Sequence, residues 1–243
     1  MTLSGRHIFI TGAAKRIGRR IAETLAEKAP CRIALHYGTS QREALELKTA
    51  LEAKGSQALC VQADLGDPTQ MAAAVKKAAE AFGPIDIGIN SASIFSGCPS
   101  ERETVPAWTR MLDVNLRGQF FCAQAIYQYR APSCCLIHIS DVHAEHPQPG
   151  FAAYCAAKAG LTNLSQLLAR EWAPHVRSNA IHPGPVLFPE NYTEEKKLIS
   201  VRNTLLKRRG SPDDVAEAVV FLTENDYVNG IALHVDGGQG GTS

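Results

Sequence analysis

Short apolar runs rich in β-branched residues alternate with longer amphipathic segments along the whole chain. Such runs indicate buried strands, and apolar positions three and four apart indicate helices that cover a sheet. The expected strands are His7–Thr11, Arg32–His36, Ala58–Gln62, Ile85–Ile89, Cys135–Ser140, Ser178–His182 and Ile231–Val235. The expected helices are Ile17–Lys28, Arg42–Ala53, Thr69–Ala81, Ala107–Arg130, Ala152–Trp172 and Asp213–Leu222.

This alternation predicts an α/β fold with a doubly wound parallel sheet. Right-handed crossovers make 3-2-1-4-5-6-7 the natural order of its seven expected strands. No repeat, low-complexity tract or linker interrupts the pattern, so we expect one Rossmann-type domain over residues 1–243. The longest irregular stretch, residues 184–207, would lie over the carboxyl ends of the strands, where ligands bind in such sheets. We expect it to form a flap over a substrate.

Composition and charge narrow the functional class. A hydrophobic content of 45% and a charged content of 20% are typical of globular domains. The net charge is +1 and no basic run is present, so we expect no nucleic-acid partner. No apolar stretch is long enough to cross a bilayer and the N-terminus lacks a signal-peptide layout, so we expect a cytoplasmic protein without a membrane partner. Seven cysteines without metal spacing predict reduced thiols and no metal site.

Tyr154 and Lys158 form the most informative short motif. Residues four apart share a helix face, so the ammonium of Lys158 would lie beside the phenol of Tyr154. A phenol has a pKa of about 10 in water, and a nearby cation lowers that pKa. Asp141 stands thirteen residues before the tyrosine. A second such pair, Tyr192 and Lys196, follows several prolines in a polar stretch, so we interpret it as surface structure and the first pair as catalytic.

A glycine-containing turn follows the first expected strand. Gly12 and Gly18 flank Lys15 and Arg16, and a helix is expected to begin here. Free backbone N–H groups and the helix dipole make a strand–turn–helix junction a site for a pyrophosphate. The two basic side chains add positive charge that a structural turn would not need. The sequence therefore predicts a dinucleotide site in this first βα unit.

The end of the second strand indicates which dinucleotide binds. An acidic residue there would bind a ribose 2′-hydroxyl and select NAD. The chain instead has His36, Tyr37, Thr39 and Ser40, with no carboxylate. Hydrogen-bond donors here and the basic residues of the glycine turn suit a 2′-phosphate, so we expect NADPH/NADP⁺; a helix cap at Thr39 or Ser40 is the structural alternative.

The third strand is followed by Asp64 and Leu65. A carboxylate at this strand end could bind an adenine amino group. A strand-end aspartate is as often a turn residue, so this contact only supports the cofactor prediction.

Together these motifs resemble the short-chain dehydrogenase/reductase family over essentially the whole chain. Asn90-Ser91-Ala92-Ser93 stands where the family has Asn-Asn-Ala-Gly, Asn115 matches its helical active-site asparagine, and Asp236-Gly237-Gly238 follows the last strand as in the family. The resemblance implies catalysis by Tyr154, Lys158 and Asn115, with Asn115 positioning a water, and it implies a homo-oligomer, for which we expect a tetramer. The implied cofactor contacts are Gly12, Lys15, Arg16, Ile17, Gly18, His36, Tyr37, Ser40, Asp64, Leu65, Asn90, Ala92, Tyr154, Lys158, Pro183, Gly184 and Val186.

Departures from the family pattern are more specific. Arg16 replaces the middle glycine of the cofactor loop, and Asp141 stands where the family usually has serine. Ser93 ends the Asn-Asn-Ala-Gly element and Phe95 follows closely. This combination resembles the pteridine reductase branch. The resemblance implies that Arg16, Ser93, Phe95, Asp141 and Tyr154 bind substrate, with Phe95 stacking a pterin and Asp141 sharing proton delivery. That branch often has His-Arg-Ser after the tyrosine, and this chain lacks the arginine.

The charge of Asp141 bears on the substrate. In a ketone reductase the serine hydroxyl donates a hydrogen bond to the ketone oxygen, but an ionised carboxylate only accepts and repels a developing alkoxide. A substrate rich in N–H donors turns that repulsion into attraction. The alternative is that Asp141 caps a turn while the neighbouring Ser140 supplies the hydroxyl.

The sequence thus predicts an NADPH-dependent reductase that transfers hydride to a pterin, dihydrobiopterin- or dihydromonapterin-like or a folate, as its small-molecule substrate. The alternative within the enzymes is an NADPH-dependent carbonyl reductase acting on 3-oxoacyl or other ketones. A non-catalytic NADPH-binding regulator is an alternative of another class, against which the intact Tyr154, Lys158 and Asn115 argue.

Overall fold

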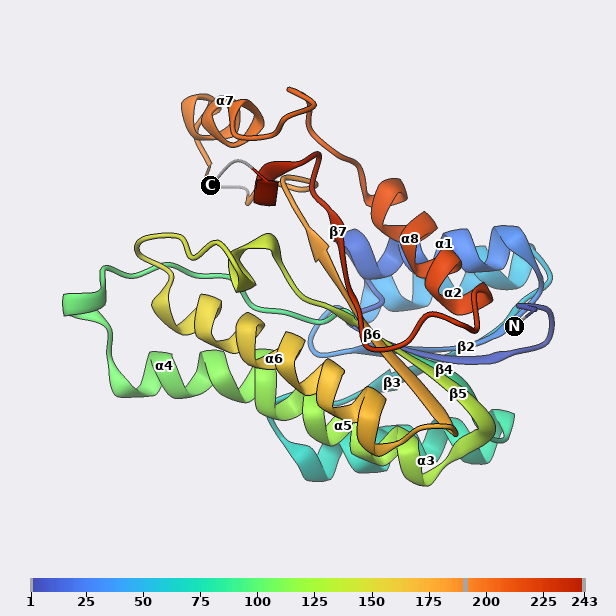
Figure 1. Ribbon diagram of the computed structural model, residues 1–243. Coiled ribbons are helices and arrows are strands. Elements are labelled where there is room, and N and C mark those ends of the chain that lie inside the picture. Colours follow the sequence, from blue (N-terminus) through green and yellow to red (C-terminus); the bar gives the residue numbers. More distant parts are fainter. Residues whose placement is uncertain (1, 190–191, 242–243) are drawn as a thin grey trace.

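The computed structural model describes residues 2–189 and 192–241. Its one sheet has seven parallel strands in the order β3-β2-β1-β4-β5-β6-β7, which confirms the predicted fold (Figure 1). The strands are β1 (His7–Thr11), β2 (Arg32–Tyr37), β3 (Gln57–Gln62), β4 (Ile85–Asn90), β5 (Arg130–Ile139), β6 (Val176–Pro183) and β7 (Ala232–Val235). The helices are α1 (Arg16–Lys28), α2 (Gln41–Ala53), α3 (Pro68–Phe82), α4 (Val105–Leu112), α5 (Gly118–Gln128), α6 (Ala152–Glu171), α7 (Glu194–Arg202) and α8 (Pro212–Glu224).

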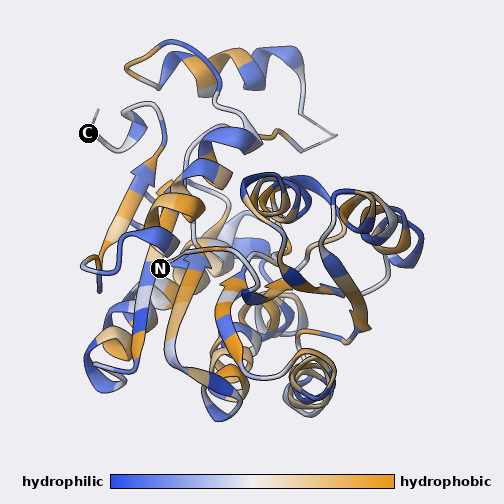
Figure 2. Cartoon of the chain, turned by 90° about the vertical axis from the view of Figure 1, so that its right-hand side faces the viewer, coloured by the Kyte–Doolittle hydropathy of each residue, from blue (hydrophilic) through white to orange (hydrophobic). Residues whose placement is uncertain are grey.

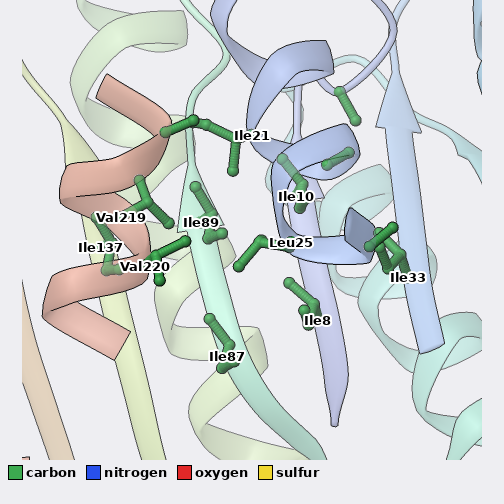
Figure 3. Close-up of a cluster of buried hydrophobic side chains, with 14 of the residues drawn as sticks. Ile8, Ile10, Ile21, Leu25, Ile33, Ile87, Ile89, Ile137, Val219 and Val220 are labelled. Carbon is green, nitrogen blue, oxygen red and sulfur yellow. The ribbon is translucent and has the colours of Figure 1, made fainter. Parts of the chain in front are cut away.

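Helices cover both faces of the sheet, with α1, α2 and α8 on one face and α3 to α6 on the other (Figure 1). On the first face Ile21 and Leu25 of α1 and Val219 of α8 pack against apolar strand residues such as Ile8 and Ile89 (Figure 3). Figure 2 shows the apolar positions gathered in the strands and on the helix faces turned toward them. Because both faces of the sheet are covered, central strands such as β1 and β4 are buried along their whole length.

Local capping explains where several helices begin. Asp67 accepts hydrogen bonds from the backbone N–H groups of Thr69 and Gln70 at the start of α3, and Pro68 occupies the first helical position. Ser211 and Asp214 form a reciprocal capping box at the start of α8. None of the described helices is long and apolar enough to cross a membrane.

The expected single helix Ala107–Arg130 is wrong in its details. The chain forms α4, then a π-helical turn over Asp113–Arg117, then α5, and Arg130 already begins β5. The wider π turn contains Asn115, and such turns often reorient a side chain at a functional site. Strand β5 is correspondingly longer than expected and ends at Ile139.

The expected flap is not wholly irregular, because the nine-residue helix α7 lies inside residues 184–207. Figure 1 shows α7 standing away from the sheet, on the side of the molecule where β7 ends. Thr193 caps this helix by accepting a hydrogen bond from the N–H of Lys196. The flap therefore has a helical arm beyond its first, extended part.

Candidate functional site

A cleft of about 780 Å³ lies at the carboxyl ends of the strands. Its walls come from the segments that follow β1, β4, β5 and β6, together with α6 and the flap. This is the edge at which a doubly wound parallel sheet binds ligands. Of the expected site residues, those that line it are Gly12, Lys15, Arg16, Ile17, Gly18, Tyr37, Ser40, Ala92, Ser93, Phe95, Asp141, Tyr154, Lys158, Pro183, Gly184 and Val186.

The turn after β1 leaves space and free donors for a ligand. Gly12 has φ 63°, and a Cβ there would lie 2.7 Å from the Cα of Ala92, so only glycine fits. A Cβ on Gly18 would collide with the carbonyl of Gly12. Lys15 is the N-cap of α1 and its side chain makes no capping bond, so it does not compete with an anion for this helix start. A pyrophosphate fits this cradle.

Arg16 adopts a backbone conformation that favours glycine. Its φ is 54°, in the left-handed region, which residues other than glycine rarely adopt. Its guanidinium Nη2 donates to the carbonyl oxygen of Leu187 in the flap at 3.3 Å. Arg16 therefore links the phosphate-binding turn to the flap across the cleft. Lys15 lines the same wall, where its ammonium forms a 2.9 Å ion pair with Glu43.

His36 does not contact the cleft, contrary to its expected role as a cofactor ligand. Its side chain is buried, with Nδ1 accepting from the N–H of Gly12 at 3.2 Å and Nε2 facing the carbonyl of Ala63 at 3.1 Å. Burial lowers the pKa of His36 to about 4, so the ring is neutral and offers no charge to a phosphate. The ring instead holds the glycine turn in place. Tyr37 and Ser40 do line the cleft, and the Ser40 side chain makes no capping bond.

Three further expected cofactor residues face elsewhere. The carboxylate of Asp64 binds the guanidinium of Arg110 through two 3.1 Å contacts, and the backbone N–H of Gly66 donates to it. Leu65 is buried in the core beneath α3 and α5. Asn90 is buried and donates to the Gln119 carbonyl and to Nδ1 of His138. These residues support the strand ends rather than line the cleft, because structural partners already occupy Asp64 and Asn90.

Asp141 both caps a turn and faces Tyr154. Its Oδ1 accepts from the N–H of His143 at 2.9 Å, and its Oδ2 accepts from the Tyr154 hydroxyl at 2.7 Å. The capping alternative is thus correct, but it does not turn the carboxylate away from the cleft. Ser140 cannot replace it, because its buried hydroxyl donates to the carbonyl of Lys158 and contacts the Thr162 hydroxyl.

The environment of Tyr154 reverses the expected electrostatics. Burial raises the pKa of Tyr154 well above 10, and the Asp141 carboxylate raises it further by charge repulsion and by accepting a hydrogen bond from the phenol. A hydrogen bond with Ser93 opposes this shift. The prediction that Lys158 lowers the tyrosine pKa is wrong for this state, since the carboxylate is closer to the phenol oxygen than any cation. Tyr154 is a neutral phenol.

Lys158 lies under the tyrosine in the interior of α6. Its Nζ donates to the carbonyl of Ile139 at 2.8 Å and lies 5.7 Å from the centre of the Tyr154 ring. Burial lowers the pKa of Lys158 to about 8, against the charge of Asp141, which raises it. The side chain lines the cleft although it is 2% exposed. A buried ammonium at this depth is available to hydroxyl groups of a bound ligand.

The side chain of Asn115 fixes the segment that follows β4, where Ser93 lines the cleft. Its Oδ1 accepts from the N–H of Ile94 at 2.9 Å and from the Ser93 hydroxyl at 3.1 Å. Its Nδ2 donates to the carbonyl of Ile94 at 2.8 Å and contacts the sulfur of Met111. Both amide hydrogens are therefore used within this wall. The π turn presents Asn115 to this wall.

Aromatic side chains form another part of the cleft lining. Phe95 stacks on Phe151 with ring centres 4.7 Å apart and meets Tyr154 edge-on at 4.8 Å. Its side chain is 39% exposed, so part of its surface faces the cleft. From the flap, Phe188 and Tyr192 stack with ring centres 6.2 Å apart and line the same cleft.

Sequence reasoning missed several lining residues. Gln148 and His143 enter from the turn after β5, and Leu187 and Phe188 enter from the flap. Tyr192 was assigned to surface structure, and Lys196 is indeed exposed beside its ring, yet Tyr192 lines the cleft. No motif marks these positions, because the path of an irregular segment decides which of its side chains turn inward. The proline-rich composition after Pro183 was the only signal.

Comparisons with known proteins agree with this geometry. A family model described as enoyl-(acyl carrier protein) reductase matches residues 12–239. The chain is 35% identical to 3beta-hydroxysteroid dehydrogenase 1 of Eggerthella lenta, over 98% of this chain and 94% of the relative. It is 32% identical to a 3-oxoacyl-[acyl-carrier-protein] reductase of Staphylococcus aureus, over 95% and 96% of the two chains.

Solved structures with a similar fold are also similar to this chain in sequence. A blue fluorescent protein from a metagenomic library, in complex with NADPH, shares 32% identity and a TM-score of 0.93, covering 98% of this chain and 99% of that one. The chain thus belongs to the short-chain dehydrogenase/reductase family, a family of oxidoreductases. Within it, the named relatives match the carbonyl-reductase alternative better than the pterin interpretation.

Proposed function

We propose that this protein is an NADPH-dependent reductase whose cleft binds a donor-rich heterocycle of the pterin class. The observation that carries the substrate class is the Asp141 carboxylate, whose Oδ2 lies 2.7 Å from the hydroxyl of Tyr154 and lines the cleft. NADP(H) is supported by the NADPH complex of a structural neighbour and by a cleft wall with Lys15 and Arg16 but no acidic residue at the end of β2.

The cofactor would be held by residues of both cleft walls. Arg16 and Ile17 would bind its phosphates through the open start of α1, where Gly12 leaves room for them, and Lys158 would bind its ribose hydroxyls. NADPH, when bound, supplies the hydride. Pro183, Gly184 and Val186 would border the nicotinamide, and Gly184 lets the chain pass within contact of Asp236, where a Cβ would lie 2.7 Å from the Cα of that residue.

Reduction of a C=N bond adds a hydride to carbon and a proton to nitrogen. The neutral phenol of Tyr154 is the proton donor nearest the substrate wall, and Asp141 beside it would accept N–H groups of the substrate. Ser93 and Phe95 would complete the pocket, Ser93 by hydrogen bonding and Phe95 by stacking on a flat ring. Arg16 would contact both cofactor and substrate from the opposite wall.

A ketone is the second candidate substrate, and the curated relatives favour it. A hydroxyl group next to Tyr154 would then help to bind the ketone oxygen. In this chain the Ser140 hydroxyl is buried and already hydrogen-bonded, and the ionised Asp141 would compete for the proton of Tyr154. Because of these contacts, a ketone fits the geometry of the site less well than a pterin does.

Turnover separates the two substrates. NADPH oxidation is followed by absorbance with 7,8-dihydrobiopterin and with a set of 3-oxoacyl and steroid ketones at matched concentrations. The proposal expects oxidation with the pterin and little with the ketones, and a weaker rate with NADH than with NADPH. Oxidation with ketones alone would overturn the pterin assignment, and no oxidation with any substrate would favour a non-catalytic binding protein.

A further inference from the structure

Two imidazoles and a carboxylate meet behind the turn that presents Asp141. His182 on β6 pairs with His234 on β7 in the sheet register, so both side chains lie on the same face of the sheet. Their ring centres are 4.9 Å apart. Glu145, which follows the turn after β5, has Oε1 3.6 Å from Nδ1 of His182 and Oε2 3.2 Å from Nε2 of His234. None of the three lines the catalytic cleft.

His182 carries an unpartnered nitrogen aimed into this cluster. Its side chain is 0% exposed, and Nδ1 has no hydrogen-bond partner among the described residues. Its other nitrogen, Nε2, lies 2.9 Å from the hydroxyl of Thr162, which reaches the carbonyl of Lys158 at 3.0 Å. When the Thr162 hydroxyl donates its hydrogen bond to that carbonyl, its oxygen accepts from Nε2–H of His182, and the lone pair of Nδ1 then points at the Glu145 carboxylate. A cation between them removes that repulsion.

We propose that Glu145, His182 and His234 bind a divalent transition-metal ion, with Zn²⁺ as the preferred ion. Two histidines and one glutamate are a known zinc donor set with room for a fourth ligand. Imidazole nitrogens exclude Mg²⁺ and Ca²⁺ as the natural occupants, since these ions take oxygen ligands. The proposal concerns a site separate from the hydride-transfer cleft and does not depend on the substrate.

The distances suit the metal after a small contraction. The donor atoms of the three residues lie within 4.8 Å of one another. Tetrahedral Zn²⁺ with bonds of about 2.1 Å separates its ligands by about 3.4 Å. Glu145 is 45% exposed in its side chain and His234 is 35% exposed, so both can adjust and the ion can enter from solvent. The buried His182 would be the fixed ligand.

Each histidine also has a partner behind it, as metal-binding histidines usually do. His182 has Thr162, and Nδ1 of His234 lies 3.6 Å from Oδ2 of Asp236. Asp236 is itself fixed, because it accepts from the N–H groups of Gly238 and Gly240 at 2.8 and 2.7 Å. A bound ion would tie β6, β7 and the turn bearing Asp141 together at the end of the sheet.

The test uses the untagged full chain, stripped with a chelator. Because Cys60 and Cys98 are partly exposed thiols that also bind zinc, both are replaced by serine in every sample. Calorimetric titration with Zn²⁺ should give one ion per chain, and Mg²⁺ should give no binding. Co²⁺ should develop the visible absorption of a four- or five-coordinate site with nitrogen ligands. Zn²⁺ should also raise the melting temperature.

Matched variants decide the assignment. Glu145→Gln and His234→Gln alter exposed side chains that the fold tolerates, and each should weaken Zn²⁺ binding by more than about tenfold and remove the Co²⁺ absorption. His175→Gln, which removes an exposed histidine outside the cluster, should leave both unchanged. Absence of one-to-one binding in the parent chain, or equal binding by all three variants, would overturn the site and leave a hydrogen-bonded histidine–glutamate cluster.

Discussion

The hydroxyl of Tyr154 donates a 2.7 Å hydrogen bond to Oδ2 of Asp141, thirteen residues earlier in the chain. In this state the phenol is paired with a carboxylate rather than with the Lys158 ammonium, which donates to a backbone carbonyl. The bond keeps the proton on the tyrosine and points it at a group that can only accept. Under the proposed function, N–H donors of the substrate would replace the phenol at Asp141 and free Tyr154 to donate its proton.

Removing the phenol hydroxyl tests whether Tyr154 donates the proton in the reaction. Tyr154→Phe should lower kcat/KM by about 10²–10⁴-fold, the usual contribution of a positioned general acid. NADPH affinity should stay within about twofold of the parent, because the ring and Lys158 remain. Tyr192→Phe is the matched control, since Tyr192 lines the cleft from the flap and has no place in proton transfer. Equal losses in both variants would contradict the assignment.

Ultraviolet titration of the phenol tests whether Asp141 raises the pKa of Tyr154. The difference spectrum between the parent and Tyr154→Phe should show no tyrosinate below about pH 10, since burial and Asp141 raise the pKa of Tyr154. Asp141→Asn removes the negative charge, so the tyrosine should ionise at a lower pH than in the parent. A tyrosinate signal from Tyr154 near neutral pH in the parent would show that Lys158 governs the phenol after all.

The pH profile reports on Lys158. Its pKa is lowered to about 8 by burial, so the free enzyme should lose the buried ammonium as the pH rises through that value. We expect kcat/KM, which follows the free enzyme, to fall about tenfold per pH unit above about pH 8. The profile is measured with constant ionic strength and checked for unfolding by circular dichroism. A flat profile up to about pH 10 would contradict the lowered lysine pKa.

Arg16→Gly should separate stability from ligand binding. The left-handed backbone of Arg16 costs a non-glycine residue about 1–2 kcal/mol, although glycine makes the unfolded chain more flexible. Stability by urea unfolding should therefore stay equal or rise by up to about 1 kcal/mol, while the KM for NADPH rises. Arg19→Gly, in the regular part of α1, is the control and should lose about 1 kcal/mol. A destabilised Arg16→Gly would contradict the strained turn.

Acid should destabilise the fold through buried neutral histidines. The pKa values of His36 and His138 are each lowered to about 4 by burial, below the ordinary value of 6.5. Their stabilising contribution is complete above about pH 6.5 and is lost as the pH falls toward 4, by up to about 3 kcal/mol each. His36→Gln should flatten the dependence of unfolding free energy on pH between 7 and 5, and His175→Gln should not. If unfolding free energy depends on pH with the same slope in His36→Gln as in the parent, His36 is not a source of the acid destabilisation.

The strand order of the sheet was predictable from the sequence because each strand and helix is marked by a local pattern of residues. Apolar runs mark the strands, amphipathic segments mark the crossovers, and handedness fixes the order. The glycine turn was also predictable, and the positive φ of Arg16 confirms that the residue stands at a glycine position. The π turn at Asn115 was not, because nothing in the residues of the α4–α5 segment distinguishes it from a continuous helix.

The contacts of the site residues could not be predicted from the sequence, because they join residues that are far apart in the chain. A strand-end histidine can point outward or inward, and the inward bonds of His36 to Gly12 and Ala63 depend on the neighbouring strands. Asp64 has its carboxylate occupied by Arg110, a residue far along the chain. Glu145, His182 and His234 meet only through the register of β6 with β7. Local pattern carries none of these tertiary relationships.

The most direct test of the central claim is the ratio of pterin to ketone turnover in the parent enzyme and in Asp141→Ser. Initial rates of NADPH oxidation are compared with 7,8-dihydrobiopterin and with a 3-oxoacyl ketone. We expect a ratio well above one in the parent that falls by at least about tenfold in the variant, through loss of pterin binding and gain of ketone reduction. A parent that turns over only the ketone, with Asp141→Ser leaving the ratio unchanged, would contradict it.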